Sequence, residues 1–168
     1  TSLATLNAPL PRVTHTAIWT GSEMIVWGGR GATALADGAR YSPASNTWNA
    51  VSNTNAPSAR ARHTAVWTGN AMVVWGGQGA AALASGAMYD PLADTWTATN
   101  DVNAPEARAD VESVWTGTEM LVWGGQGVSG PVDTGGRFDP LANSWSATPT
   151  TNAPQPRYGH SAVWDGTE

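Results

Sequence analysis

Three histidines recur at one point of a repeated sequence pattern and could together bind a metal ion. They are His15, His63 and His160, and three imidazole groups suit zinc, copper or iron. The third repeat has Val111 at this point, and equivalent points of neighbouring repeats tend to lie too far apart for metal–nitrogen bonds of about 2 Å. We therefore predict that the histidines pack against tryptophans and that the chain holds no metal or other cofactor.

The third repeat also carries acidic side chains that the other repeats lack. Asp110 and Glu112 are two residues apart, so on a strand both would face the same side of a sheet. With Asp133, these carboxylates could bind calcium or act as an acid/base pair. Nothing in the sequence brings Asp133 close to the other two, and drift within one repeat is the simpler explanation. Whether Asp110, Glu112 and Asp133 bind an ion stays open from the sequence.

One arginine follows each Asn-Ala-Pro triplet at a fixed offset. The four are Arg12, Arg60, Arg108 and Arg157. A ring of guanidinium groups would attract carboxylates or phosphates. A residue that occurs once per repeat is more often part of the repeat's own construction. We therefore expect each arginine to bond to carbonyl groups or to an acidic side chain on the adjacent sheet.

These residues share a spacing because the sequence repeats about every forty-eight residues. The ten tryptophans, the Asn-Ala-Pro triplets and the double glycines all recur with this step. A fixed period in this range indicates a repeat architecture.

Each repeat predicts four short strands, and no segment has the spacing of a helix. In the first repeat the strands are His15 to Thr20, Met24 to Trp27, a strand that ends at Tyr41, and Thr47 to Val51. The second strand is apolar at every position, which indicates burial on both faces. A sheet buried on both faces needs another sheet on each side. The pattern therefore predicts an all-β fold in which the repeats are blades of a β-propeller.

The order of the markers resembles the kelch repeat in its bacterial form. A hydrophobic strand, a double glycine, an aromatic residue with Asp-Pro and a tryptophan are followed by proline, arginine and His-Thr-Ala-Val-Trp. The resemblance covers the whole chain and implies four-stranded antiparallel kelch blades. Residues 13–60, 61–108 and 109–157 would be three blades, residues 1–12 the outer strand and linker of a preceding blade, and residues 158–168 the first strand of the next.

Three and a half blades do not close a ring. Six or seven kelch blades would need roughly 290 to 340 residues. We expect the chain to be an excerpt of a longer propeller. The alternative is that chains associate through exposed blade faces.

The resemblance also implies a binding site. In kelch interaction domains, the residue after the double glycine and the residue just before the innermost strand commonly line the ligand-binding face. In this sequence these residues are Arg30, Gln78, Gln126, Thr14, Arg62 and Asp110. The alternative is that they are ordinary solvated loop residues.

Composition excludes several classes of function. The basic residues are 8 arginines against 13 acidic residues, so the net charge is -5 and no basic run favours nucleic acid. No apolar stretch reaches the roughly 18 residues of a membrane span, which argues against membrane insertion. The chain has no cysteine, whereas the copper site of galactose-oxidase-like enzymes uses a tyrosine crosslinked to cysteine. That site cannot be complete within this segment.

We therefore predict a non-catalytic interaction or scaffold module that binds a protein, peptide or glycan on a loop face. Bacterial kelch-like chains of similar composition look secreted, so the resemblance implies an extracellular or cell-envelope location. The alternative is the propeller portion of a larger carbohydrate-active or galactose-oxidase-like enzyme whose active site lies outside this segment.

Overall fold

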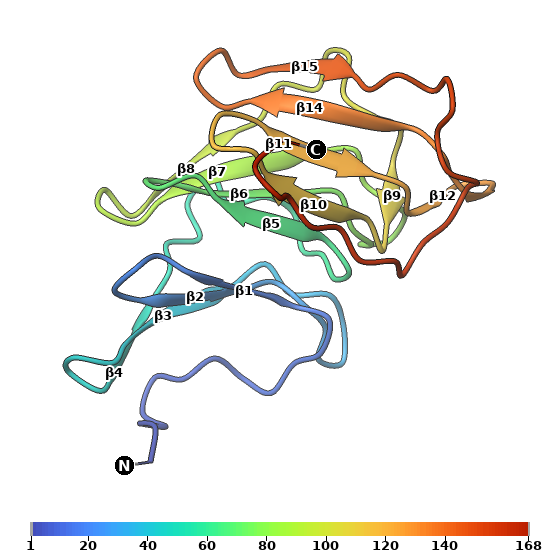
Figure 1. The fold of residues 1–168 in the computed structure, drawn as a ribbon. Coiled ribbons are helices and arrows are strands. Elements are labelled where there is room, and N and C mark those ends of the chain that lie inside the picture. The colour runs from blue at the N-terminus through green and yellow to red at the C-terminus, as the bar shows by residue number, and fades with distance from the viewer. Residues whose placement is uncertain (1, 168) are drawn as a thin grey trace.

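Each of the three repeats folds into a four-stranded antiparallel sheet, as the computed structural model shows for residues 2–167 (Figure 1). Within each sheet the strands follow one another in chain order from the innermost to the outermost. Blade 1 consists of β1 (Thr16–Trp19), β2 (Met24–Trp27), β3 (Gly38–Ser42) and β4 (Thr47–Ala50). Blade 2 consists of β5 (Thr64–Trp67), β6 (Met72–Trp75), β7 (Gly86–Asp90) and β8 (Thr95–Ala98). Blade 3 consists of β10 (Glu112–Trp115), β11 (Met120–Trp123), β14 (Gly135–Asp139) and β15 (Ser144–Ala147).

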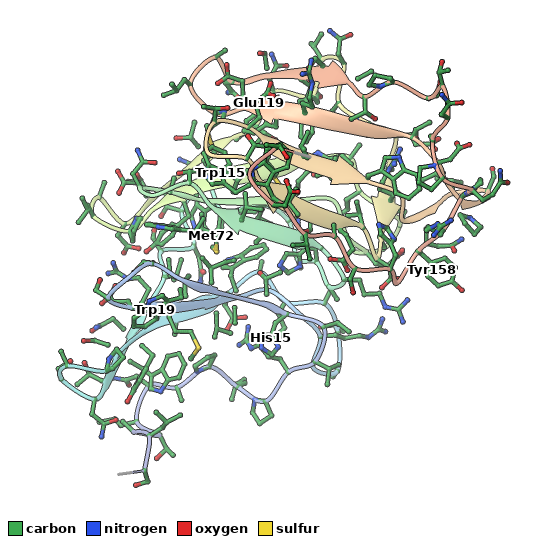
Figure 2. All side chains as sticks on the ribbon, viewed as in Figure 1. His15, Trp19, Met72, Trp115, Glu119 and Tyr158 are labelled. Carbon is green, nitrogen blue, oxygen red and sulfur yellow. The ribbon has the colours of Figure 1, made fainter. Side chains whose placement is uncertain are left out.

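The second strand of the middle blade is buried on both faces because its side chains alternate between two cores. On β6, Met72 and Val74 belong to the core shared with blade 1, whereas Val73 and Trp75 belong to the core shared with blade 3. All four residues of β6 are buried, and Figure 2 shows Met72 between the first two sheets. This alternation is the two-residue period of a strand, and it confirms the predicted all-β fold of stacked four-stranded blades.

The innermost strands of successive blades lie side by side. Strand β5 contacts both β1 and β10. The outermost strands bury only their tryptophan: on β8, Trp96 is 4% exposed while its three neighbours in the strand are exposed. The residues that the structure describes contain no helix, and therefore none that is long and apolar enough to cross a membrane.

The two partial repeats at the chain ends form no strand within the described residues. Residues 2–12 and 158–167 show no strand here, so the predicted outer strand in residues 1–12 and the predicted first strand in residues 158–168 stay predictions. A strand exists only where a neighbour pairs with its backbone. In blade 1 that neighbour of the innermost strand is β2, and residues 158–167 have no counterpart of β2 beside them. Thr1 and Glu168, the ends of these two predicted segments, lie outside the described residues.

A small sheet that the sequence analysis did not predict joins the loops of blade 3. It consists of β9 (Arg108–Ala109), β12 (Gln126–Gly127) and β13 (Gly130–Pro131), in the order β13-β12-β9. Blades 1 and 2 have isolated bridges at the same places: Arg30 pairs with Val13 and Ala34, and Gln78 pairs with Ala61 and Ala82. This pairing sets the position of the predicted binding residues.

Candidate partner-binding face

Antiparallel strands place the connections of each blade at two opposite ends. The hairpin between the first two strands and the turn between the last two lie at one end, which we call the hairpin face. It comprises residues 20–23, 43–46, 68–71, 91–94, 116–119 and 140–143. The loop between the second and third strands lies at the other end with the link into each blade, and we call this the loop face. It comprises residues 12–15, 28–37, 60–63, 76–85, 108–111 and 124–134.

The double glycine allows the backbone at Gly28 and Gly29 to lie close against the next blade. Gly28 and Gly29 have φ values of 64° and 94°, a region that side chains disfavour. A Cβ atom on Gly28 would lie 2.7 Å from Cε1 of His63. The N–H of Gly29 donates to the carbonyl of Arg60, 2.8 Å away. Only glycine allows this approach, which fixes where the following residue lies.

The residue after each double glycine is held by a pair of backbone hydrogen bonds. Arg30 and Val13 exchange N–H to carbonyl bonds of 2.8 and 2.9 Å. Gln78 pairs in the same way with Ala61, and Gln126 pairs with Ala109. Each of these three residues is therefore fixed beside the segment that leads into the innermost strand of its own blade.

The residues just before the innermost strands form a second row, which we call the pre-strand residues. They are Thr14, Arg62 and Asp110, with φ values of 53°, 55° and 50°. The N–H of Arg62 donates to the carbonyl of Thr14, and the N–H of Asp110 donates to the carbonyl of Arg62, each at 3.0 Å. This chain of bonds connects neighbouring blades and places the three pre-strand residues next to one another.

The structure thus places all six predicted residues on the loop face in two adjacent rows. The side chains of Thr14, Arg30 and Arg62 are exposed, and those of Gln78, Asp110 and Gln126 are half-buried. Arg62 lies 3.3 Å from the carboxylate of Asp110. Arg30 also lines a shallow groove of about 320 Å³ between blades 1 and 2, with Thr33, Ala34, Ala59, Gly79 and Ala80. No observation tests whether these residues bind a partner, so that role stays a prediction.

Three of the four repeated arginines, Arg12, Arg60 and Arg108, bond to two carbonyl groups within their own blade. Arg60 is fully buried, and its Nη1 donates to the carbonyls of Gly76 and Ser85 at 3.0 and 2.6 Å. Its Nε donates to the carbonyl of Ser58 at 2.9 Å. The expected carbonyl bonds are confirmed. The guanidinium reaches along its own blade, however, because the arginine lies at the start of that blade. Its backbone bonds to the preceding blade: the N–H of Arg60 donates to the carbonyl of Leu35 at 3.0 Å, and its carbonyl accepts from the N–H of Gly29.

Burial changes the ionisation of Arg60 without removing its charge near neutral pH. Desolvation lowers the pKa of Arg60 to about 10. The side chain therefore stays protonated, and its donors are occupied by carbonyl groups and by the hydroxyls of Ser58 and Ser85, so it is not available to a ligand.

The second histidine packs in the core as predicted. The His63 ring meets Trp27 of the preceding blade edge-on, with ring centroids 5.4 Å apart and an interplanar angle of 76°. Its Nε2 is 2.8 Å from Oγ1 of Thr16. Desolvation, together with the positive charge of Arg60, lowers the pKa of His63 to about 3. The ring is therefore neutral at physiological pH.

The other two histidines do not lie with His63 in a common metal-binding group. His160 packs against Trp123 with ring centroids 5.4 Å apart, and His15 is exposed (Figure 2). Within residues 2–167 no three His, Asp or Glu side chains form a group that could hold a metal ion. The structure therefore does not bring Asp110, Glu112 and Asp133 together as ligands.

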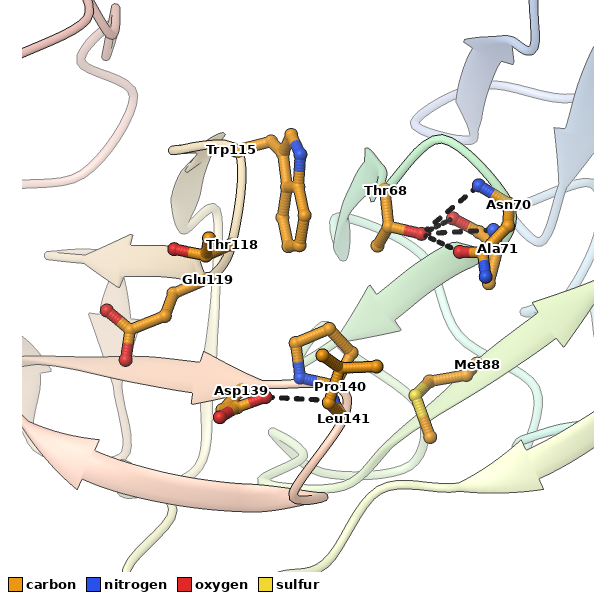
Figure 3. Close-up of a pocket in the computed structure, with 11 residues that line it drawn as sticks. Thr68, Asn70, Ala71, Met88, Trp115, Thr118, Glu119, Asp139, Pro140 and Leu141 are labelled. Carbon is orange, nitrogen blue, oxygen red and sulfur yellow. Dashed lines mark hydrogen bonds between the residues drawn. The ribbon is translucent and has the colours of Figure 1, made fainter.

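A second, larger groove lies on the hairpin face and was not predicted from the sequence. It has a volume of about 580 Å³ and lies between blades 2 and 3 (Figure 3). The groove is lined by Thr68, Asn70, Ala71, Met88, Trp115, Gly117, Thr118, Glu119, Asp139, Pro140 and Leu141. A sequence signal for it exists, because blades 1 and 3 carry a glutamate and an arginine where blade 2 has Ala71 and Met88.

Comparison with known proteins supports the fold. The chain matches the KLHDC2/KLHL20/DRC7 Kelch-repeats domain over residues 2–168, which confirms the kelch resemblance. No curated protein matches the chain. Among solved structures, that of YjhT is similar with a TM-score of 0.73 and 17% sequence identity, covering 89% of this chain and 55% of that one. At this identity the likeness shows the fold alone, and this chain spans about half the length of the YjhT structure.

The family match extends over all three observed blades and both flanking partial repeats. The chain therefore belongs to the family of KLHDC2/KLHL20/DRC7 Kelch-repeats domains.

Proposed function

We propose that this chain is a non-catalytic propeller module that binds a protein, peptide or glycan partner on its loop face. The observation that carries the proposal is the arrangement of the six residues in two rows on a rigid backbone. Arg30, Gln78 and Gln126 occupy one position of the repeat, where backbone pairing fixes the main chain. Binding residues are commonly carried on loops that a rigid scaffold positions in this way.

The side chains at these positions are free to serve recognition. Arg30 is exposed, and the hydrogen bonds at this residue within the described chain come from its backbone. Gln126 makes only a 3.4 Å contact from Nε2 to the carbonyl of its neighbour Gly127. Guanidinium and amide groups offer several hydrogen-bond donors to a partner. Replacing these side chains would therefore change recognition without removing a structural bond.

Membership of the kelch family supports a protein-binding or scaffold role for the fold. We extend the proposal to an extracellular or cell-envelope location, because the chain lacks cysteine and resembles secreted bacterial kelch-like chains in composition. The second candidate function is the propeller portion of a larger enzyme whose active site lies outside this segment. Binding of a partner on the loop face is compatible with that function too.

The test is selection of peptides from a displayed random library on the full chain. Peptides that bind the unmodified protein are then offered to a triple variant, Arg30→Ala with Gln78→Ala and Gln126→Ala. We expect capture to fall at least about tenfold while the melting temperature stays within about 2 °C, because no core contact is removed.

A matched control replaces three exposed residues at one repeat position away from the loop face. Thr47, Thr95 and Ser144 begin the outermost strands and are exposed, and their alanine variants should capture peptide normally. Peptides that bind the loop-face variant as well as the unmodified chain would show that this face is not the binding surface. Native mass spectrometry of the same samples checks for association of one chain with another through its blade faces.

A further inference from the structure

At the junction between blades 1 and 2, the fold places an arginine on the hairpin face. Between blades 1 and 2, Nη1 of Arg40 donates to the backbone carbonyl of Pro91 in blade 2. The same guanidinium lies 3.7 Å from the carboxylate of Glu23 in its own blade. The Arg40 side chain is only 19% exposed. One arginine thus crosses the junction and occupies the space between these blades.

The equivalent groove between blades 2 and 3 has lost both members of that pair. Met88 stands at the position of Arg40, and Ala71 stands at the position of Glu23. Blade 3 has the pair again, with Arg137 3.8 Å from Glu119. Both partners have changed together and only in the middle blade, which leaves a groove where the first junction has a filled space.

The open groove keeps the groups that an arginine would contact. Pro140 corresponds to Pro91, and within residues 2–167 no side chain donates to its carbonyl. The Trp115 ring reaches toward Pro140 in Figure 3, and Met88 borders the same space. These apolar walls suit the aliphatic part of an arginine side chain, and a tryptophan face attracts a guanidinium group.

Charge favours a cationic occupant. The charged residues that line the groove are Glu119 and Asp139, both acidic. Oδ1 of Asp139 accepts from the N–H groups of Leu141 and Ala142, and Glu119 has a side chain that is 31% exposed. The chain as a whole has a net charge of -5. A guanidinium group in the groove would therefore meet a carbonyl oxygen and two carboxylates, of which Glu119 already lies 3.8 Å from Arg137.

We propose that the groove between blades 2 and 3 binds a partner protein through an arginine side chain of that partner. This arginine takes the place that Arg40 occupies at the first junction: its aliphatic part packs against Met88 and Trp115, and its guanidinium donates to the carbonyl of Pro140 and faces Glu119. The groove lies on the face opposite the loop face, so this site goes beyond the proposed function and either can fail without the other.

The test uses a blocked pentapeptide, Ala-Leu-Arg-Leu-Ala, and the same peptide with citrulline in place of arginine. Citrulline keeps the shape and loses the charge. Binding to the full chain is followed by NMR through the methyl group of Met88 and the indole N–H of Trp115. Met72 and Met120, both fully buried, serve as internal references. We expect the arginine peptide to shift the Met88 and Trp115 signals with an affinity about tenfold higher than that of the citrulline peptide, because charged hydrogen bonds are the stronger ones.

A variant closes the groove by copying blade 1. Met88→Arg with Ala71→Glu should restore the glutamate–arginine pair and abolish the shift of the Trp115 signal. Equal affinity for the two peptides would overturn the proposal, as would signals that do not move at millimolar peptide. Shifts of the same signals that depend on protein concentration without peptide would identify a second copy of this chain as the occupant, and would also overturn it. The peptide comparison on the unmodified chain decides the question even where the variant fails to fold.

Discussion

The junction between blades 1 and 2 and the junction between blades 2 and 3 share their backbone and differ in the side chains that fill them. At the first junction the N–H of Gly29 donates to the carbonyl of Arg60, and at the second the N–H of Gly77 donates to the carbonyl of Arg108, both at 2.8 Å. Tryptophan pairs cross both junctions at almost the same separation, 5.2 Å for Trp27 with Trp96 and 5.3 Å for Trp75 with Trp145.

The side chains at the two junctions differ at both faces. On the loop face, His63 bonds to Thr16 at the first junction, whereas Val111 takes the histidine position at the second. Thr64, which corresponds to Thr16, pairs there with the hydroxyl of Ser113. On the hairpin face, Arg40 closes the first groove and Met88 leaves the second open. The repeated backbone thus forms the scaffold, and a few substitutions distinguish the junctions. The first junction has a buried histidine whose ionisation depends on pH, and the second has an open groove beside Met88.

The largest expected effect on stability comes from replacing the buried arginine that both junctions share, Arg60 at the first and Arg108 at the second. Arg60→Met and Arg108→Met each keep most of the side-chain volume but leave one buried carbonyl without a donor, that of Gly76 in the first case and that of Gly124 in the second. They also remove one of the two donors to the carbonyls of Ser85 and Thr134, which still accept from the N–H groups of Gly76 and Gly124. Each variant should lose about 3–5 kcal/mol of unfolding free energy, measured by urea titration.

Arg157 is the matched control for these variants. Arg157 is exposed, and its Nε donates to the carbonyl of Gln155 at 3.0 Å. Arg157→Met should therefore cost less than about 1 kcal/mol. Losses at Arg60 and Arg108 that differ by more than a factor of two would show that the two junctions are not built alike.

The next effect is a pH dependence that belongs to the first junction alone. His63 has a folded-state pKa of about 3 against 6.5 as its reference value. Between these values the unfolded chain binds a proton and the folded chain does not, so unfolding becomes easier as the pH falls below 6.5. Relative to His63→Val, the unmodified chain should lose about 2 kcal/mol of unfolding free energy between pH 7 and pH 5.

The valine variant copies the residue found at the second junction, which makes it a conservative reference. The converse change, Val111→His, should introduce a similar fall in stability at the second junction, because that site is also buried. Parallel pH profiles for the unmodified chain and His63→Val would mean that water reaches the histidine and that the junctions do not differ in this respect.

The features that recur in every repeat could be predicted from the sequence, whereas the groove between blades 2 and 3, which depends on substitutions in one repeat, could not. Strand periods, double glycines and aromatic spacing gave the blades, and the fixed arginine offset gave a structural role for Arg60. The open groove depends on residues that are far apart in sequence: Arg40 and Glu23 meet only because β3 pairs with β2, which sets Arg40 opposite Ile25. That register could not be read from one sequence. The absent strand at residues 160–165 has a similar cause, since strand formation depends on a neighbour and not on the segment alone.

Arg62 takes part in both junctions through its backbone, and its expected effect is smaller. Its φ of 55° lies in the left-handed region, where side chains other than glycine are strained, and the fourth repeat has Gly159 there with φ 63°. Arg62→Gly should change the unfolding free energy by less than about 1 kcal/mol, because relief of strain offsets chain entropy and the loss of an exposed ion pair. Arg62→Val should cost about 1–2 kcal/mol. Equal urea midpoints for the two variants would contradict a conformational role for this position.

The smallest effect on stability accompanies a gain of binding at the first junction. Arg40→Met with Glu23→Ala gives blade 1 the residues of blade 2 at both positions, and it should cost less than about 1 kcal/mol because the ion pair is partly exposed. The change also removes the Nε of Arg40, a buried donor that has no partner among the described residues.

If the missing arginine is what opens a groove, this variant should bind a second equivalent of the Ala-Leu-Arg-Leu-Ala peptide and shift the indole signal of Trp67, which corresponds to Trp115. Arg40→Lys keeps a cation in place and should bind one equivalent. A double variant that stays folded and still binds one equivalent would show that the second groove owes its openness to more than Met88 and Ala71, with the surrounding Pro140 and Leu141 of blade 3 as the next residues to exchange.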